Sequence, residues 1–142
     1  MTVDEKIAYG TRPWFEMIGE VMCGAATAAK LDADVNFRLV EHFVNGDDWG
    51  DGLFEGFRLD IVKGEPSFQV GVRPGEFGDL TVNVTRAASR TLNTLHGYDP
   101  GFEPALQRLT NAGEFEVVNG NLSDLFELIG PIHDEVVDRT AA

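Results

Sequence analysis

Four segments in the middle of the chain alternate apolar and polar residues with a period of two. They run over residues 35–43, 57–61, 68–72 and 80–84. A period of two puts the apolar side chains of a strand on one face, so each segment is predicted to be a strand with one buried and one wet face. Turns containing glycine and proline at 63–66 and 73–79 favour antiparallel returns, and the four strands are predicted to form a meander.

The flanking segments carry apolar residues at helical spacing instead. Helices are predicted over residues 13–30, 86–96 and 101–112, and after Asn121 with a break at Gly130-Pro131. Thr85 and Asn121 are suitable N-caps, and residues 114–119 are predicted to form a short fifth strand. Because the polar face of the sheet can stay in water, helices are needed on one face only. The expected fold is a two-layer α+β domain over residues 1–142, with a five-stranded, mostly antiparallel sheet and helices packed on one face.

The charge of the chain excludes some partners. Its 142 residues include 11 Lys and Arg against 24 Asp and Glu, a net charge of −13 at pH 7. Such a field repels nucleic-acid phosphates and anionic lipid headgroups, so neither nucleic-acid binding nor strong membrane association is expected. Cys23 is the single cysteine and residues 1–10 carry no apolar leader segment. Both features are typical of a cytoplasmic protein.

The familiar catalytic and nucleotide-binding motifs are absent. The sequence contains no G-x-S-x-G, G-x-G-x-x-G or P-loop pattern. The acidic loop that begins at Asp47 does not fit a calcium loop, because Trp49 and Arg58 occupy ligand positions. His42 is predicted to lie on the polar face of its strand, and His133 on a solvated helix rich in carboxylates. No catalytic residue, metal site or cofactor is therefore assigned.

The aromatic residues are mostly of one kind, with ten Phe against two Trp and two Tyr. Phenylalanine supplies apolar surface without a polar group, which suits both a solid core and the lining of a hydrophobic cavity. Methionine side chains would suit an adaptable cavity wall. The residues expected to line a ligand cavity are Trp14, Met17, Met22, Phe57, Phe68, Phe102, Leu106, Leu125, Phe126 and Ile129.

The order of elements and four stretches of sequence carry a family resemblance. The stretches are GLFEGFRLDIVKGEP (52–66), GDLTVNVTRAASRTLNTLHG (78–97), PALQRLTNAGEFEVVNGN (104–121) and NLSDLFELI (121–129). With a helix, four strands, two helices, a strand and a final apolar helix, residues 13–138 resemble the sterol carrier protein type 2 (SCP-2-like) family of lipid-binding domains. The sequence departs from the family at Glu114-Phe115-Glu116-Val117, where lysines are frequent, and its end lacks a Ser-Lys-Leu address.

The resemblance implies an apolar tunnel between sheet and helices that binds fatty acids, acyl chains, sterols or other lipids without catalysis. The expected function is thus non-catalytic binding or carrying of an apolar small molecule. One alternative is a small isomerase, lyase or hydratase acting on a hydrophobic substrate in the same cavity, with Arg38, His42 or His133 pointing inward. Another is an accessory module of a larger lipid or steroid catabolic enzyme. The sequence is compatible with a homodimer and with a complex with a partner enzyme.

Overall fold

The computed structural model describes residues 6–141, in which helices cover one face of a mixed sheet. The main sheet of this part of the chain has six strands: β2 (Phe37–Phe43), β3 (Asp48–Gly50), β4 (Leu53–Val62), β5 (Glu65–Val72), β6 (Leu80–Val84) and β7 (Phe115–Asn119). Two short strands near the ends, β1 (Ile7–Ala8) and β8 (Thr140–Ala141), pair in parallel. The expectation of no leader segment concerns residues 1–10, of which 1–5 lie outside the described residues.

The strand order corrects the predicted meander. β4 pairs antiparallel with β5 and with β2, but β6 pairs with β2 in parallel, with Leu39 opposite Leu80. β7 then pairs antiparallel with β6. The prediction of five strands was one short, because β3 forms in the segment taken as a turn. Alternation indicates which face of a strand is buried, but it leaves the identity of the neighbouring strand open.

The helices follow the predicted order and capping. They are α1 (Arg12–Ala28), α2 (Arg86–Leu92), α3 (Phe102–Asn111), α4 (Leu122–Ile129) and α5 (His133–Asp138). The predicted N-caps are confirmed, since Thr85 Oγ1 accepts from the Ala88 amide at 3.1 Å and Asn121 Oδ1 from the Ser123 amide at 3.0 Å. α2 stops before its predicted end, because Asn93 turns back and donates to the Ser89 carbonyl at 2.8 Å.

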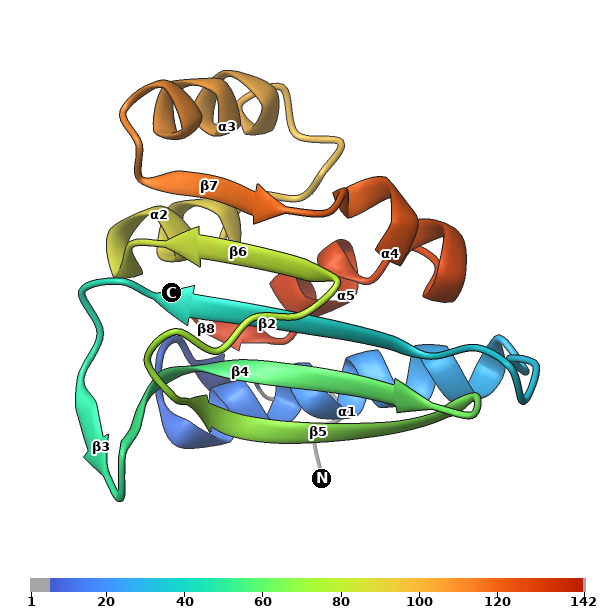
Figure 1. Ribbon diagram of the computed structural model, residues 1–142. Coiled ribbons are helices and arrows are strands. Elements are labelled where there is room, and N and C mark those ends of the chain that lie inside the picture. The colour runs from blue at the N-terminus through green and yellow to red at the C-terminus, as the bar shows by residue number, and fades with distance from the viewer. Residues whose placement is uncertain (1–5, 142) are drawn as a thin grey trace.

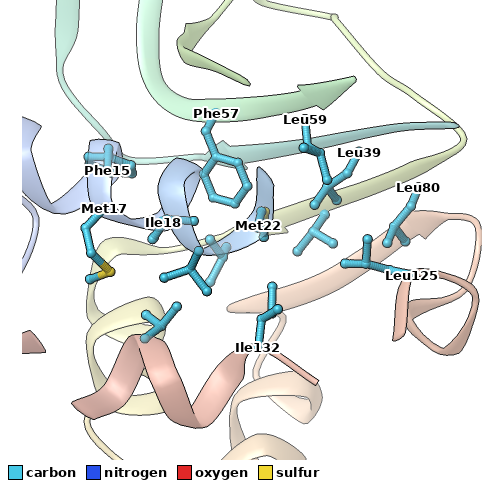
Figure 2. Packing of buried hydrophobic residues seen from close by; sticks show 14 of the residues in the cluster. Phe15, Met17, Ile18, Met22, Leu39, Phe57, Leu59, Leu80, Leu125 and Ile132 are labelled. Carbon is cyan, nitrogen blue, oxygen red and sulfur yellow. The ribbon is translucent and has the colours of Figure 1, made fainter. Parts of the chain in front are cut away.

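The helices that pack against the core lie on one side of the sheet, as the two-layer prediction requires. Figure 1 views the sheet from its helix-free side, with α1 behind β4 and β5. α1 approaches β5 closely because residue 19 is glycine: a Cβ there would lie 2.4 Å from Cδ2 of Phe68. Figure 2 shows buried side chains of α1, the sheet, α4 and the segment before α5 pointing toward one another. The α+β, two-layer class is thus confirmed.

The helix-free face, called the outer face below, carries a network of ion pairs. Asp60 accepts from Nε of Arg38 at 2.6 Å and from Nε of Arg58 at 2.7 Å. Arg58 also pairs with Glu76 in the loop between β5 and β6, so this loop is held across the outer face on its way to the far side of β2. Within residues 6–141, no helix combines the length and the apolar character that crossing a bilayer needs.

Candidate functional site

A cavity of about 480 Å³ lies between the inner face of the sheet and helices α2 to α5. Its apolar lining comes from the sheet (Val84, Phe115), α2 (Leu92), α3 (Phe102, Leu106) and α4 (Leu122, Phe126). Exposed Glu103 and Pro131 also line it, so the cavity reaches the surface. A pocket of about 140 Å³, nearer α1, shares several lining residues with it, among them Glu41, Leu122 and Phe126. The two hollows together are called the inner cavity below.

The position of the inner cavity follows from the uneven covering of the sheet. The long helix α1 packs along β5 and β4 and fills that half of the interior. The other half, formed by β6 and β7, faces the short helices α2, α3 and α4. The break at Gly130-Pro131 separates α4 from α5, and both Pro131 and His133 line the space there. Short helices joined by loops leave space that one continuous helix would fill.

Glu41 places a carboxyl group inside this largely apolar space. It follows Leu39 and precedes Phe43 on the inner face of β2, with Phe57 and Val82 as its neighbours across the two ladders. Its side chain lines both hollows. Burial raises the pKa of Glu41 to about 7, because a charged carboxylate is disfavoured away from water. Among residues 6–141, no hydrogen bond or ion pair to its carboxyl group offsets this effect.

The polar groups near Glu41 already have partners of their own. His133 Nε2 donates to the Leu95 carbonyl at 2.8 Å, which leaves Nδ1 of the neutral ring as an acceptor. Asn93 donates to Ser89, and the Tyr9 hydroxyl donates to the Arg86 carbonyl at 3.1 Å. Burial also raises the pKa of Tyr9, to about 12. Glu41 differs from these groups in having no hydrogen-bond partner among residues 6–141.

Six of the ten predicted ligand-contacting residues line the inner cavity. Phe102 and Leu106 face the larger hollow, Met22, Phe57 and Leu125 face the smaller one, and Phe126 faces both. As contacts to a ligand, these six residues remain a prediction.

The other four predicted contacts lie outside the cavity. They pack in the core or at its margin: Trp14, Met17, Phe68 and Ile129. The Trp14 indole donates to Thr140 Oγ1 at 2.8 Å, and the Phe68 ring stacks on Phe57 with centroids 5.3 Å apart. The structure thus gives these two side chains packing roles in the interior.

Glu41 is the residue that sequence reasoning missed. The apolar positions of its segment are 35, 37, 39 and 43, and the same alternation puts position 41 on the inner face. An acidic residue in an otherwise apolar row was the available signal. Of the three side chains proposed to point inward in an enzyme, His133 lines the inner cavity. His42 and Arg38 lie on the outer face, where they contact Glu76 and Asp60.

A second hollow, of about 830 Å³, lies on the outer face and is called the outer groove below. It is bounded by the loop between β5 and β6, with Phe77 exposed at 69% and Val118 at 51%. Its titratable side chains are already paired: His42 with the Glu76 carbonyl, Glu76 with Arg58, and Glu55 with Arg86. The outer groove is larger, but the inner cavity is flanked by two layers and holds an unpaired carboxyl group. The inner cavity is therefore the candidate site.

The described residues contain no cluster of side chains suited to bind a metal ion. Nowhere between residues 6 and 141 do three or more His, Cys, Asp or Glu side chains gather closely enough to hold an ion. The inner cavity instead offers apolar contact around the Glu41 carboxyl group, which can accept or donate a hydrogen bond near neutral pH.

No protein-family model matches the sequence, and no curated protein matches it. Among solved structures, the chain is similar to a crystal structure of sterol carrier protein 2, at 16% identity and a TM-score of 0.48, over 93% of this chain and 98% of that one. A conserved hypothetical protein of Thermus thermophilus, whose name suggests a sterol carrier protein, is 12% identical with a TM-score of 0.47, over 90% and 86% of the two chains. Sterol carrier protein 2 of Yarrowia lipolytica, in its apo form, is 14% identical with a TM-score of 0.37, over 90% and 84%. Three solved structures named as sterol carrier proteins, or as possibly one, are thus similar to this chain.

Proposed function

We propose that this protein binds an apolar small molecule, of lipid or sterol-like character, in the inner cavity and carries it without chemical change. The observation that carries the proposal is the larger hollow of this cavity, a space of about 480 Å³ between two layers with a lining of Phe, Leu and Val side chains. Small-molecule sites are typically concave, mostly apolar and roughly 300–1,000 Å³ in volume.

The arrangement of the lining supports binding in this place. Phe102 and Leu106 come from α3 and Phe126 comes from α4, so two short helices bring apolar side chains to the same hollow. Their apolar surfaces would gain roughly 25 cal/mol per Å² removed from water when a ligand covers them. Phe126, which is 41% exposed, has the most to gain.

The test is displacement of a fluorescent neutral reporter, N-phenyl-1-naphthylamine, by apolar competitors. Leu106→Trp fills part of the larger hollow and is expected to weaken reporter binding by about tenfold or more, which corresponds to a loss of about 1.4 kcal/mol of binding free energy. The matched control is Val62→Trp, which adds the same indole at an exposed strand end away from the cavity. Equal binding by the wild type and both variants would contradict the proposal.

A catalytic function in the same cavity is the second candidate, and Glu41 favours it. An unpaired carboxyl group with a pKa near 7 in an apolar space is suited to moving a proton. The test is to incubate the protein with apolar ketones in D₂O and to follow exchange of the protons next to the carbonyl by NMR. Exchange catalysed by the wild type and lost in Glu41→Gln would support catalysis. Ligand binding without exchange would contradict catalysis and would support the carrier function only.

A further inference from the structure

We propose that the inner cavity selects apolar ligands that carry a hydrogen-bond-donating group, a protonated amine above all, and that it places this group against the carboxyl of Glu41. The proposal rests on the proposed function, because it names the chemical class of ligand for the same cavity. The cavity is then expected to bind long-chain carboxylates, which are apolar ligands of the opposite charge, less tightly.

The first support is the position of Glu41. Its backbone is fixed by β-ladders on both sides, to β4 through Phe57 and to β6 through Val82. The side chain therefore cannot leave the inner face without loss of register. It lines both hollows, and its carboxyl group is unpartnered among residues 6–141. A half-buried carboxyl without a partner in a largely apolar space is less well stabilised than one in water, so a ligand that supplies a donor offsets a cost already present in the free protein.

The second support is the sign of the charges around the cavity. The titratable side chains that line it are Glu41, Glu103, His133 and Asp134, and the buried Tyr9 hydroxyl lies close enough for Glu41 to influence it. None of the described lining residues is a lysine or arginine. A carboxylate ligand would meet like charges at both the rim and the base of the cavity. An ammonium group would meet three carboxyl groups there.

The third support is the tautomer of the one basic side chain. His133 Nε2 is occupied by the Leu95 carbonyl, so its neutral ring offers the cavity an acceptor at Nδ1. The side-chain amide nitrogen of Asn93 already donates to Ser89. The polar atoms available to a ligand are therefore mainly acceptors, which match a donor such as an ammonium or hydroxyl group.

The experiment compares three ligands with the same tail: dodecylamine, dodecan-1-ol and dodecanoate, each displacing N-phenyl-1-naphthylamine at pH 8 below its aggregation concentration. We expect dodecylamine to bind tightest and dodecanoate weakest, with about tenfold or more between them, as for hydrogen bonds to a charged group. In Glu41→Gln, dodecylamine should lose most of this advantage.

The matched control is Glu116→Gln, which removes the same charge from an exposed position on β7 whose register partner is Asn83 on the outer face. It corrects for general attraction of a cation to an acidic protein, and dodecylamine should bind it as it binds the wild type. A second readout needs no variant. Dodecylamine affinity for the wild type should fall by up to about tenfold per pH unit below pH 7, because Glu41 must then release a proton on binding.

The outcomes separate the two proposals. If the neutral reporter and dodecan-1-ol bind but dodecanoate matches dodecylamine, or if Glu41→Gln leaves the order unchanged, the selection by Glu41 is wrong and the carrier function stands. If the reporter and all three ligands fail to bind, both are wrong.

Discussion

Glu41 stands directly opposite Phe57 in the antiparallel ladder of β2 and β4, so a carboxyl group and a buried aromatic ring share the helix-covered face of the sheet. The ladder to β6 sets Val82 on the other side of Glu41. A carboxyl in such a row reduces stability when it is charged. Folding stability therefore does not account for a carboxyl at this position, whereas the proposed ligand recognition would.

The first prediction concerns the pH dependence of stability. Below about pH 4.5, Glu41 is protonated in both the folded and unfolded chains and has no effect. As the pH rises toward 7, the unfolded chain releases the proton while the folded chain keeps it, so the Glu41 contribution to the free energy of unfolding falls and levels off above pH 7. The fall is at most about 3 kcal/mol, and less where water in the cavity solvates the carboxylate.

Glu41→Gln should remove this dependence, since an amide does not titrate. Urea unfolding followed by circular dichroism at pH 5 and pH 8 is the measurement. The free energy of unfolding of the variant, relative to that of the wild type, should be higher at pH 8 than at pH 5. Glu116→Gln, at an exposed position, is the control and should follow the wild type. A constant difference between Glu41→Gln and the wild type would show that the carboxyl is well solvated in the folded protein.

The second prediction concerns Gly56, which lets β4 run close to the backbone of Glu41. Gly56 has a φ of 151°, and a Cβ there would lie 2.4 Å from the Glu41 carbonyl oxygen. Since backbone cannot move aside cheaply, Gly56→Ala should destabilise the protein by roughly 2–4 kcal/mol, as strain and overpacking combine.

The control for Gly56 is Gly24, an exposed position in α1 where an added Cβ meets no atom within 4 Å. Gly24→Ala should stabilise the protein by about 0.5–1 kcal/mol, because alanine favours the helix. Thermal unfolding of both variants checks the pair. A Gly56→Ala protein as stable as the wild type would mean that β2 and β4 are further apart than described.

The third prediction concerns Glu55, which is 2% exposed and pairs with Arg86 at the start of α2. The Asp47 amide also donates to Glu55 Oε1 at 3.1 Å. Arg86→Ala should destabilise the protein by about 2 kcal/mol, below the roughly 3–5 kcal/mol typical of a fully buried pair because the Arg86 side chain is 42% exposed. The double variant with Glu55→Gln should recover much of that loss, since no charge is then left buried. Urea unfolding of the single and double variants would contradict this if their losses simply add.

The fourth prediction concerns the start of α2, which borders the inner cavity. Thr85 Oγ1 accepts from the Ala88 amide at 3.1 Å and lies 3.2 Å from Glu114 Oε1. Thr85→Ala should cost about 1 kcal/mol of stability through loss of the cap, and Thr85→Ser should retain most of it. Chemical denaturation of the two variants distinguishes them, and equal losses would point to the Thr85 methyl group rather than the cap.

The sequence was sufficient to predict most of the helices and strands and the two layers. Alternation over residues 35–43 and the caps Thr85 and Asn121 depend on neighbours in the chain, and each was confirmed. The parallel pairing of β6 with β2 was not predictable in this way. It depends on a loop that crosses the outer face and is held there by Arg58 and Glu76, which are distant in sequence.

The cavity was predicted less completely than the fold, for a physical reason. An apolar residue such as Met17 or Ile129 gives the same sequence signal in a solid core as in a cavity wall, and only packing separates the two. Glu41 differs, because its position in an apolar row is visible in the sequence. A polar residue at an inward position is therefore a more informative marker of a cavity than the apolar residues around it.

The location of ligand binding is tested most directly by two-dimensional NMR of the labelled protein titrated with dodecylamine. Binding in the inner cavity predicts shifts of the amide signals of Glu41, Leu122 and Phe126, with the Glu41 carboxyl signal changing most, while Phe77 and Val118 at the outer groove stay in place. Shifts confined to Phe77 and Val118, or no shifts at all, would contradict ligand binding between the sheet and the helices.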